Sequence, residues 1–391
     1  MYQHLYTNGP KECAEVPHYT FQDHFGKASP SFPPRTVFID YLKGYWRHIG
    51  VPVKKIKLNH CVEQVNFDED KNIFIVKAKD LRNDKSSLSS FDYLVIASGH
   101  FSTPNLPTFD GMESFKGRIL HSHDFRNAEE FRGQSVLVIG SSRSASDISQ
   151  QCLKFGSKKV TISLRNKNSP ITQFKWPEKI KLLPLIKKVD GNTCTFSDGY
   201  HESFDSILLC TGYQYHFPFL PESIKLKCKN SYFPPNLYRG IKWYPMTKDQ
   251  NDCKGRLFYM GMQNQNYTIS MFMIQAKWIA QNIAGKLETP KANICKQEIK
   301  YWYEQNKKIT DFSSAYKAQT NYLKRLSCDT GYEHDLDCQD LFINAIEARK
   351  VDVLSFRDHI HTSKHSGVTA KLHDKPWMEN FDDSLESYIG N

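Results

Sequence analysis

The sequence predicts a doubly wound α/β protein in which one nucleotide-binding domain interrupts another. The central observation is a strand-turn-helix-strand unit in the middle of the chain. The apolar run VLVIG (136–140) leads into the turn GSSRSASD (140–147), and a helix is expected over 144–155, ended by Gly156. A second strand, KKVTISLR (158–165), completes the βαβ unit.

Two further apolar runs, each ending in a glycine turn, predict where the chain passes between the two domains. They are FDYLVIASGH (91–100), read as a buried strand, and SILLCTGY (206–213). Because these runs flank the βαβ unit, the segment between them is expected to form the smaller, inserted domain.

The remaining elements are predicted from local patterns. Thr36 is expected to cap a helix over 37–49 that Gly50 closes. Strands are expected at KKIKL (54–58), VEQVNF (62–67) and NIFIVKA (72–78), with the turns DED and RNDKSS after the second and third. Another helix is expected over SMFMIQAKWIAQNIAG (270–285), and the rest of the polar C-terminal part is expected to be irregular.

Composition and charge describe a globular protein of two or three domains. The chain has 391 residues, 39% of them hydrophobic, and a formal net charge of +10. Lysines and arginines are interleaved with acids, and the sequence contains no arginine-rich block or RNA-binding motif. Solvated basic faces are therefore favoured over a nucleic-acid interface.

Cysteine spacing and terminal segments suggest a cytoplasmic protein. None of the ten cysteines forms a C-x-x-C pair, which argues against a disulfide framework, a structural zinc site and a dithiol oxidoreductase. The first residues do not resemble a signal peptide, and no apolar run approaches the roughly 20 residues that a membrane-spanning helix needs.

The turn GSSRSASD occupies the place of a phosphate-binding G-x-G-x-x-G loop. Gly140 would make the tight turn, while Ser142 and Ala145 stand at the second and third glycine positions. Alanine still allows close helix–strand packing, and the Ser142 hydroxyl could donate to a pyrophosphate beside the helix N-terminus. Taken alone this loop is a weak signal, since many strand-to-helix turns look similar.

Arg165, directly after the second strand, sharpens the prediction towards NADP. An acidic residue near this point would bind the ribose 2′-hydroxyl of NAD, whereas arginine favours the 2′-phosphate of NADP, and Lys167 could assist. An ordinary surface arginine is the alternative interpretation.

A fingerprint upstream of this unit carries a family resemblance. FKGRILHSHDF (115–125) reads F-x-G-x-x-x-H-x-x-x-F, with Phe115, Gly117, His121 and Phe125 at its fixed positions. This pattern is similar to that of flavin-containing monooxygenases, particularly the soluble bacterial trimethylamine-monooxygenase branch. The terminal Phe125, followed by Arg126, resembles the N- and S-oxygenating enzymes, whereas the Baeyer–Villiger relatives carry Trp there.

Other segments along the chain carry the same resemblance in the same order. They are YTNGPKE (6–12), DYLVIASGHFSTPNLP (92–107), LLCTGY (208–213), LFYMGMQNQ (257–265), FRDHIHTSKHSG (356–367) and KPWMENFDDSLESY (375–388).

The resemblance implies a two-dinucleotide-binding-domain α/β flavoprotein. Residues 1–101 and 212–391 would form a Rossmann-like FAD domain with a C-terminal extension, and 102–211 an inserted NADPH domain. The family's first βαβ unit, with the G-x-G-x-x-G that holds FAD, has no counterpart in this sequence, so the FAD domain is expected to be N-terminally truncated.

The implied reaction is oxygenation of a tertiary amine or a sulfide to its N- or S-oxide, with NADPH and O₂, through a C4a-hydroperoxyflavin. Asn8 would be the catalytic residue, with its amide on the flavin and NADP⁺, although an N-G-P tripeptide taken alone is usually a turn. The alternative is an inactive NADP-binding remnant of the family, because the FAD loop is absent. A homodimer is a possible assembly.

The resemblance also assigns cofactor-binding positions. His121 would set the linker between the domains, with a catalytic base as the less favoured role. The three histidines at 359, 361 and 365 would be ordinary packing or surface residues, since the family uses no metal. The expected cofactor-binding residues are Gly140, Ser141, Ser142, Ser144, Ala145, Arg165, Gly99, His100, Thr211, Gly212 and Gln263.

Three positions depart from the trimethylamine-oxidising branch. That branch carries Asp and Trp where Asn264 and Asn266 stand here, and Tyr where Arg143 stands. An aromatic face binds a small ammonium-like group by cation–π attraction. The resemblance therefore supports tertiary amines or sulfides as a class more strongly than trimethylamine itself.

Overall fold

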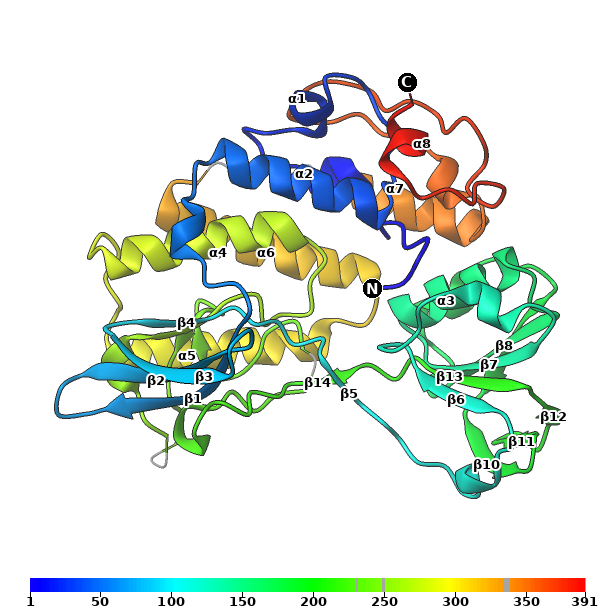
Figure 1. Ribbon diagram of the computed structural model, residues 1–391, viewed down its shortest axis with the longest axis horizontal. Coiled ribbons are helices and arrows are strands. Elements are labelled where there is room, and N and C mark those ends of the chain that lie inside the picture. The colour runs from blue at the N-terminus through cyan, green and yellow to red at the C-terminus, as the bar shows by residue number, and fades with distance from the viewer. Residues whose placement is uncertain (230, 248–249, 333–337, 391) are drawn as a thin grey trace. The chain divides into compact units, whose positions relative to one another are not determined.

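Five parallel strands form a sheet around the predicted VLVIG strand. The computed structural model describes residues 1–229, 231–247, 250–332 and 338–390 (Figure 1). The strand order is β6-β13-β7-β8-β9. The strands are β6 (Arg118–His121), β7 (Ser135–Ile139), β8 (Lys159–Leu164), β9 (Ile180–Pro184) and β13 (Ser206–Leu209).

The central strands β7, β8 and β13 are buried because other elements cover the sheet. Helix α3 (Arg143–Lys154) contacts β7 and β8, and β13 lies between β6 and β7, with Leu209 opposite both His121 and Ile139. Val136, Leu137 and Val138 are fully buried, as the continuous apolar run predicts for a parallel strand covered on both sides.

A small antiparallel sheet packs beside the parallel one. Its strands are β10 (Ile186–Asp190), β11 (Thr193–Phe196) and β12 (His201–Ser203), in that order. Val189, Cys194 and Phe196 from this sheet share one hydrophobic cluster with Leu137 and Leu209 of the parallel sheet.

Contacts divide the chain into two compact units whose limits differ from the expected domains. Unit 1 comprises Met1–Tyr45, Pro104–Gly212 and Asp337–Asn391, and unit 2 comprises Trp46–Thr103 and Tyr213–Leu336. The N-terminal and C-terminal segments were expected with the FAD domain. They group instead with the inserted segment, because they pack against α3.

Short helices and one longer helix complete unit 1. They are η1 (Lys11–Cys13), α1 (Phe21–Phe25), η3 (Met112–Ser114), η4 (Ala128–Phe131), η5 (Pro170–Gln173), α7 (Cys338–Val351), η9 (Phe356–Asp358) and α8 (Leu385–Ile389). Helix α2 (Arg35–His48) runs across the boundary between the units.

Unit 2 contains two sheets and three long helices. The sheets have the orders β1-β2-β3 and β15-β16-β17-β4, and helices α4 and α6 pack side by side (Figure 1). The strands are β1 (His60–Asp68), β2 (Ile73–Asp80), β3 (Lys85–Phe91), β4 (Leu94–Ile96), β15 (Leu237–Tyr238), β16 (Lys242–Trp243) and β17 (Leu257–Tyr259). The helices are α4 (Thr268–Ile283), α5 (Ala292–Gln305), α6 (Phe312–Thr330), η2 (Val53–Lys55), η6 (Glu222–Ile224), η7 (Cys253–Gly255) and η8 (Asn306–Lys308). A last pair of strands, β5 (Thr103–Pro104) and β14 (Tyr213–Gln214), lies at the two connections between the units.

Several local predictions are wrong. Residues 54–58 form no strand, and η2 covers the start of that run. The predicted turn RNDKSS is partly the strand β3, which pairs with β2. Thr36 lies inside α2, and its Oγ1 donates to the Asp383 carbonyl oxygen instead of capping the helix.

The expected buried strand over 91–100 is shorter and more exposed than predicted. Only Leu94–Ile96 pairs with β17, and Val95 is 38% exposed. Within the part of the chain that the structure describes, β4 lies at the edge of its sheet, so one side of it lacks a neighbouring strand.

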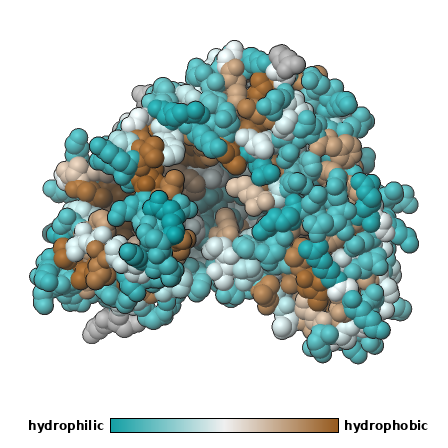
Figure 2. All heavy atoms as spheres, in the orientation of Figure 1, coloured by the Kyte–Doolittle hydropathy of each residue, from teal (hydrophilic) through white to brown (hydrophobic). Residues whose placement is uncertain are grey.

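The surface carries mixed polar and apolar groups. On the face drawn in Figure 2, hydrophilic residues predominate and apolar residues form small groups among them. Among the described helices, none combines the length and the apolar character needed to cross a membrane.

Candidate functional site

The turn after β7 has the geometry of a phosphate-binding loop. Gly140 has a φ of 141°, and a Cβ atom there would lie 2.2 Å from the carbonyl oxygen of Cys210 at the end of β13. No side chain fits this contact, which explains why the first position of the loop is glycine.

The first turn of α3 presents backbone N–H groups beside Gly140. Ser142 occupies the N-cap position in an extended conformation and makes no side-chain cap hydrogen bond. Ser142 is exposed and Ser141 and Ser144 are partly exposed, while Ala145 is fully buried against the sheet. This arrangement suits an anion, because the N-terminal amides and the helix dipole both favour negative charge.

Arg165 and Lys167 supply positive charge at the same edge of the sheet. Both are exposed and follow β8, the parallel neighbour of β7. Since the carboxyl ends of adjacent parallel strands lie on one edge, Arg165 and the Gly140 turn share this edge of the sheet. The residues present therefore fit NADP(H).

Asn8 lies in a loop that is tied to α3 through Arg357. The Arg357 Nη2 donates to the Asn8 side-chain oxygen at 3.2 Å and also to Asp147 of α3. The Asn8 carbonyl oxygen accepts from Arg349 at 3.0 Å. The structure thus places the predicted catalytic loop against the predicted nucleotide-binding helix within unit 1.

The family fingerprint is structural at each of its four positions. A Cβ on Gly117 would lie 2.2 Å from the Asp205 carbonyl oxygen. Phe115 packs against the hydrophobic cluster beneath the sheet, and Phe125 stacks on Phe131 at 5.8 Å between ring centroids. The His121 Nε2 lies 3.1 Å from the Gly212 carbonyl oxygen.

The hydrogen bonds of His121 define its neutral tautomer. The backbone N–H of His123 donates to its Nδ1 at 3.0 Å, so Nε2 carries the proton given to Gly212. Burial lowers the pKa of His121, with the carbonyl of Gly212 opposing that shift. A neutral, hydrogen-bonded imidazole at the end of β6 fits the predicted linker role.

The two crossover turns contain the predicted glycines in left-handed conformations. Gly99 has φ 77° and Gly212 has φ 82°, and nothing lies within 4 Å of a Cβ at either position. Next to Gly212, the Thr211 hydroxyl donates to the Asn105 carbonyl oxygen at 2.6 Å. These turns leave room beside the backbone, which is compatible with the approach of a flat cofactor.

His100 is packed among aromatic rings rather than presented to solvent. Its ring centroid lies 4.0 Å from that of Phe101 and 4.7 Å from that of Tyr215. Burial lowers the pKa of His100 to about 4, while a backbone contact at Gly261 acts in the opposite direction. The imidazole is therefore neutral at physiological pH.

Gln263 uses its amide inside unit 2. It is fully buried, and its Nε2 donates to the Gly240 carbonyl oxygen at 3.0 Å and to the Tyr322 hydroxyl at 3.2 Å. Its Oε1 accepts from Gln275 at 3.1 Å. A cofactor-binding role of Gln263 would therefore have to involve its backbone, and it stays a prediction.

Arg357 and Asp147 are the residues that sequence reasoning did not single out. Both are almost completely inaccessible, at 0% and 1% exposure, and they form an ion pair. Both residues lie in segments that the sequence analysis names, since Asp147 ends GSSRSASD and Arg357 lies in FRDH. Only the folded chain shows that the two segments meet.

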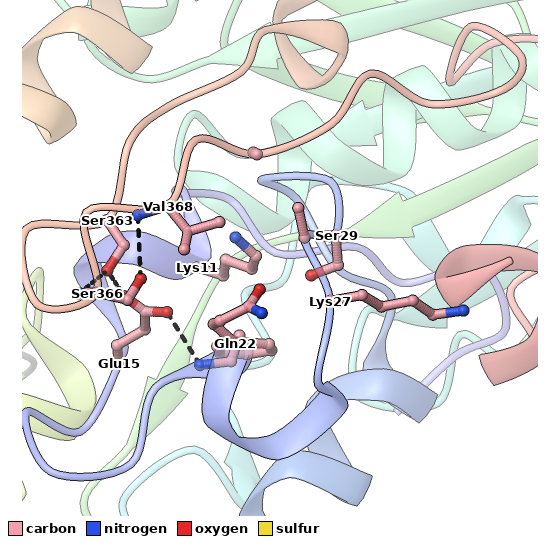
Figure 3. Close-up of a pocket in the computed structure, with 11 residues that line it drawn as sticks. Lys11, Glu15, Gln22, Lys27, Ser29, Ser363, Ser366 and Val368 are labelled. Atoms are coloured by element: carbon pink, nitrogen blue, oxygen red, sulfur yellow. Dashed lines mark hydrogen bonds between the residues drawn. The ribbon is translucent and has the colours of Figure 1, made fainter.

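The small cavity drawn in Figure 3 is not a substrate site. It lies between the segment around Lys11–Ser29 and that around Ser363–Val368, and its volume of about 10 Å³ suits one water molecule. Glu15 lines this cavity, and its carboxylate accepts hydrogen bonds from the Phe21 N–H and from the Ser363 hydroxyl. No group of histidines, cysteines and acids suitable for a metal occurs among the described residues.

Known flavin-binding monooxygenases share this fold and have similar sequences. The family model described as flavin-binding monooxygenase-like matches residues 1–175 and 171–330. The chain belongs to this family. Trimethylamine monooxygenase from Methylocella silvestris is 41% identical over 390 residues, which cover 99% of this chain and 84% of that protein.

Structural comparison gives the same result. The crystal structure of Tmm from Pelagibacter sp. strain HTCC7211 superimposes with a TM-score of 0.92 at 40% identity, covering 99% of this chain and 86% of the other. S-allyl-L-cysteine S-oxygenase from Allium sativum gives a TM-score of 0.77 at 26% identity, covering 92% and 81%. Senecionine N-oxygenase from Tyria jacobaeae is 31% identical over 84% of this chain and 70% of that protein.

These findings confirm the predicted family, fold class, cofactors and reaction type. This flavin-binding monooxygenase-like protein is an NADPH- and FAD-dependent enzyme that oxygenates soft nitrogen or sulfur nucleophiles, rather than an inactive remnant. When bound, NADPH supplies the hydride and FAD the oxygen-transfer chemistry, and the protein supplies binding, orientation and shielding.

Proposed function

We propose that this enzyme converts small tertiary amines, with dialkyl sulfides as second substrates, to their oxides, using NADPH and O₂. The proposal rests on about 40% identity to trimethylamine monooxygenases along the whole chain, together with the TM-score of 0.92. NADPH would bind at Gly140, Ser141, Ser142, Ser144 and Ala145 with its 2′-phosphate on Arg165, and Asn8 would be the catalytic residue.

The loop before α4 supports a polar substrate environment. Gln319 of α6 holds this loop by its backbone: its Nε2 donates to the Asn264 carbonyl oxygen, and its Oε1 accepts from the Asn266 N–H at 2.8 Å. We propose that these residues face the substrate, where amide side chains offer hydrogen bonds instead of a cation–π face. This favours the neutral amine, whose lone pair is the nucleophile, over its ammonium form.

Product analysis with the full-length holoenzyme tests the proposal. NADPH oxidation is expected to accelerate with trimethylamine, with a larger tertiary amine and with dimethyl sulfide, and mass spectrometry should show one added oxygen atom per molecule. Asn8→Ala should lower the yield of oxide per NADPH. NADPH oxidation that never yields an oxygenated amine or sulfide would refute the proposal.

We further propose that the enzyme works in the cytoplasm and assembles as a homodimer. A reducing compartment such as the cytoplasm fits ten free cysteines, seven of which are buried. Ile39 and Leu42, both more than one-third exposed on α2, offer an apolar face for a second copy in a homodimer. Light scattering on purified Leu42→Glu and wild-type protein tests the assembly: a monomeric wild type would refute it.

A further inference from the structure

Arg357 is a fully buried cation that forms an ion pair with the buried carboxylate of Asp147. Its Nη2 donates to Asp147 Oδ1, and the Tyr2 hydroxyl donates to the other oxygen of Asp147. Burying two charges carries a large desolvation cost, so an interior ion pair typically adds little net stability. Stability from the ion pair alone therefore does not account for an arginine at this position.

The remaining donors of Arg357 reach two separate segments. Its Nε donates to the Thr7 carbonyl oxygen at 3.3 Å, and its Nη2 to the Asn8 side-chain oxygen at 3.2 Å. Its Nη1 donates to Gln150 of α3 at 3.2 Å. Arg357 thus joins the N-G-P loop to the helix that begins at the nucleotide-binding turn.

Aromatic packing leaves the guanidinium little freedom to move. Its carbon lies 4.6 Å from the ring centroids of both Phe356 and Trp377. Planar stacking and a fixed fork of donors are properties of arginine that lysine cannot reproduce.

The contact to Asn8 decides which way the asparagine amide points. A guanidinium only donates, so the side-chain oxygen of Asn8 must face Arg357 and its NH₂ group must point away. The loop backbone is held independently, because Arg349 donates to the Asn8 carbonyl oxygen. The two arginines therefore control different parts of the same residue.

We infer that Arg357, with Asp147 behind it, is a positioning residue that orients the Asn8 amide so that its N–H bonds face the reacting partners. The inference rests on the proposed role of Asn8. It predicts that Arg357 acts on the reaction through Asn8, without contacting substrate or cofactor.

A double-mutant cycle tests this dependence. In the holoenzyme, Arg357→Lys keeps the charge beside Asp147 and removes the fork, and kcat for amine oxygenation should fall about ten-fold. The share of NADPH oxidation that releases hydrogen peroxide should rise, while KM for NADPH changes little. In the Asn8→Ala background the same substitution should have almost no further effect.

A second variant and a matched control protect the test against a folding defect. Asp147→Asn keeps Arg357 but weakens its fixation, so peroxide release should lie between that of wild type and Arg357→Lys. Arg256→Lys changes a partly buried arginine of unit 2 that donates to the Asn72 carbonyl oxygen, and it should leave peroxide release unchanged.

A readout that does not depend on turnover is the side-chain amide signal of Asn8. In protein labelled with ¹⁵N-asparagine, the Asn8 pair, identified by its loss in Asn8→Ala, should be sharp in wild type. It should broaden or shift towards a freely rotating amide in Arg357→Lys. An unchanged signal in Arg357→Lys would overturn the inference.

The failures of the two proposals are distinguishable. Absence of any oxygenated product from wild type would refute the proposed substrates, whereas the Asn8 amide signal would still test the orientation. If wild type is active and Arg357→Lys is coupled like wild type, or if its effect adds fully to that of Asn8→Ala, the positioning role is refuted.

Discussion

The Nε2 of His121 donates to the carbonyl oxygen of Gly212 at 3.1 Å, which joins the end of β6 to the end of the inserted segment. The histidine of the family fingerprint therefore fixes the backbone of a crossover turn. The imidazole is buried, and burial lowers its pKa, so the ring that holds this turn is neutral.

Loss of this hydrogen bond should affect stability more than chemistry. His121→Ala leaves the Gly212 carbonyl without this donor, and we expect a loss of about 1–3 kcal/mol in the free energy of unfolding. Urea denaturation measures that loss. Activity per folded molecule should stay within about two-fold of wild type; a much larger fall in kcat without destabilisation would indicate a catalytic histidine.

Gly140→Ala should damage the nucleotide-binding turn severely. The added Cβ would lie 2.2 Å from the Cys210 carbonyl oxygen, so β13 or the turn must move. We expect a loss of stability above about 3 kcal/mol and weaker NADP⁺ binding, measured by calorimetry. Gly133→Ala is the control, since that residue has φ 73° and open space around it, and the change should cost only about 1 kcal/mol.

Arg165→Ala should reduce selectivity for NADPH over NADH. Removing a guanidinium partner of the 2′-phosphate should raise KM for NADPH at least about ten-fold, equivalent to about 1.4 kcal/mol, and leave KM for NADH unchanged. Lys158→Ala, an exposed cation at the amino end of β8, serves as the charge-matched control. Equal effects on both cofactors would place the 2′-phosphate elsewhere.

Stability should decrease as pH falls from about 6.5 to 4. Burial lowers the pKa of His373 to about 4 from its ordinary value of 6.5, so the unfolded chain binds the proton first as pH falls. The ring centroid of His373 lies 6.5 Å from that of Tyr6 and 5.9 Å from that of Tyr388, so His373→Phe keeps an aromatic ring at this position. Between about pH 6.5 and pH 4, wild type should lose about 2 kcal/mol more of its free energy of unfolding than His373→Phe does. Urea titration at each pH measures both losses. Parallel curves would contradict the prediction.

The inserted nucleotide-binding segment could be predicted because its signals are local. The strands at 136–140 and 158–165 and the helix between them agree with β7, β8 and α3 within one residue at each end. A continuous apolar run between turn residues has few alternatives to a buried parallel strand, and Gly156, with φ 89°, ends the helix as expected.

Helices α5, α6 and α7, which lie in the part of the chain expected to be irregular, could not be predicted in the same way. Their buried faces include polar residues such as Glu298 of α5 and Gln319 of α6, which weaken the apolar periodicity. Glu298 is buried because Arg239 pairs with it at 2.7 Å, and Gln319 because it binds the backbone of the loop before α4. Such burial depends on partners distant in the sequence.

For the site, the sequence determined which residue types are present at the nucleotide turn: a glycine where no Cβ fits, an alanine that packs on the sheet, and an arginine after β8. It also determined the family, through the fingerprint F-x-G-x-x-x-H-x-x-x-F at 115–125. Tertiary structure alone decided that the loop at Asn8, helix α3 and the FRDH segment meet at Arg357. Residues 8, 147 and 357 are far apart in the chain, and only the folded chain brings them within hydrogen-bonding distance, where the desolvated guanidinium must satisfy its donors.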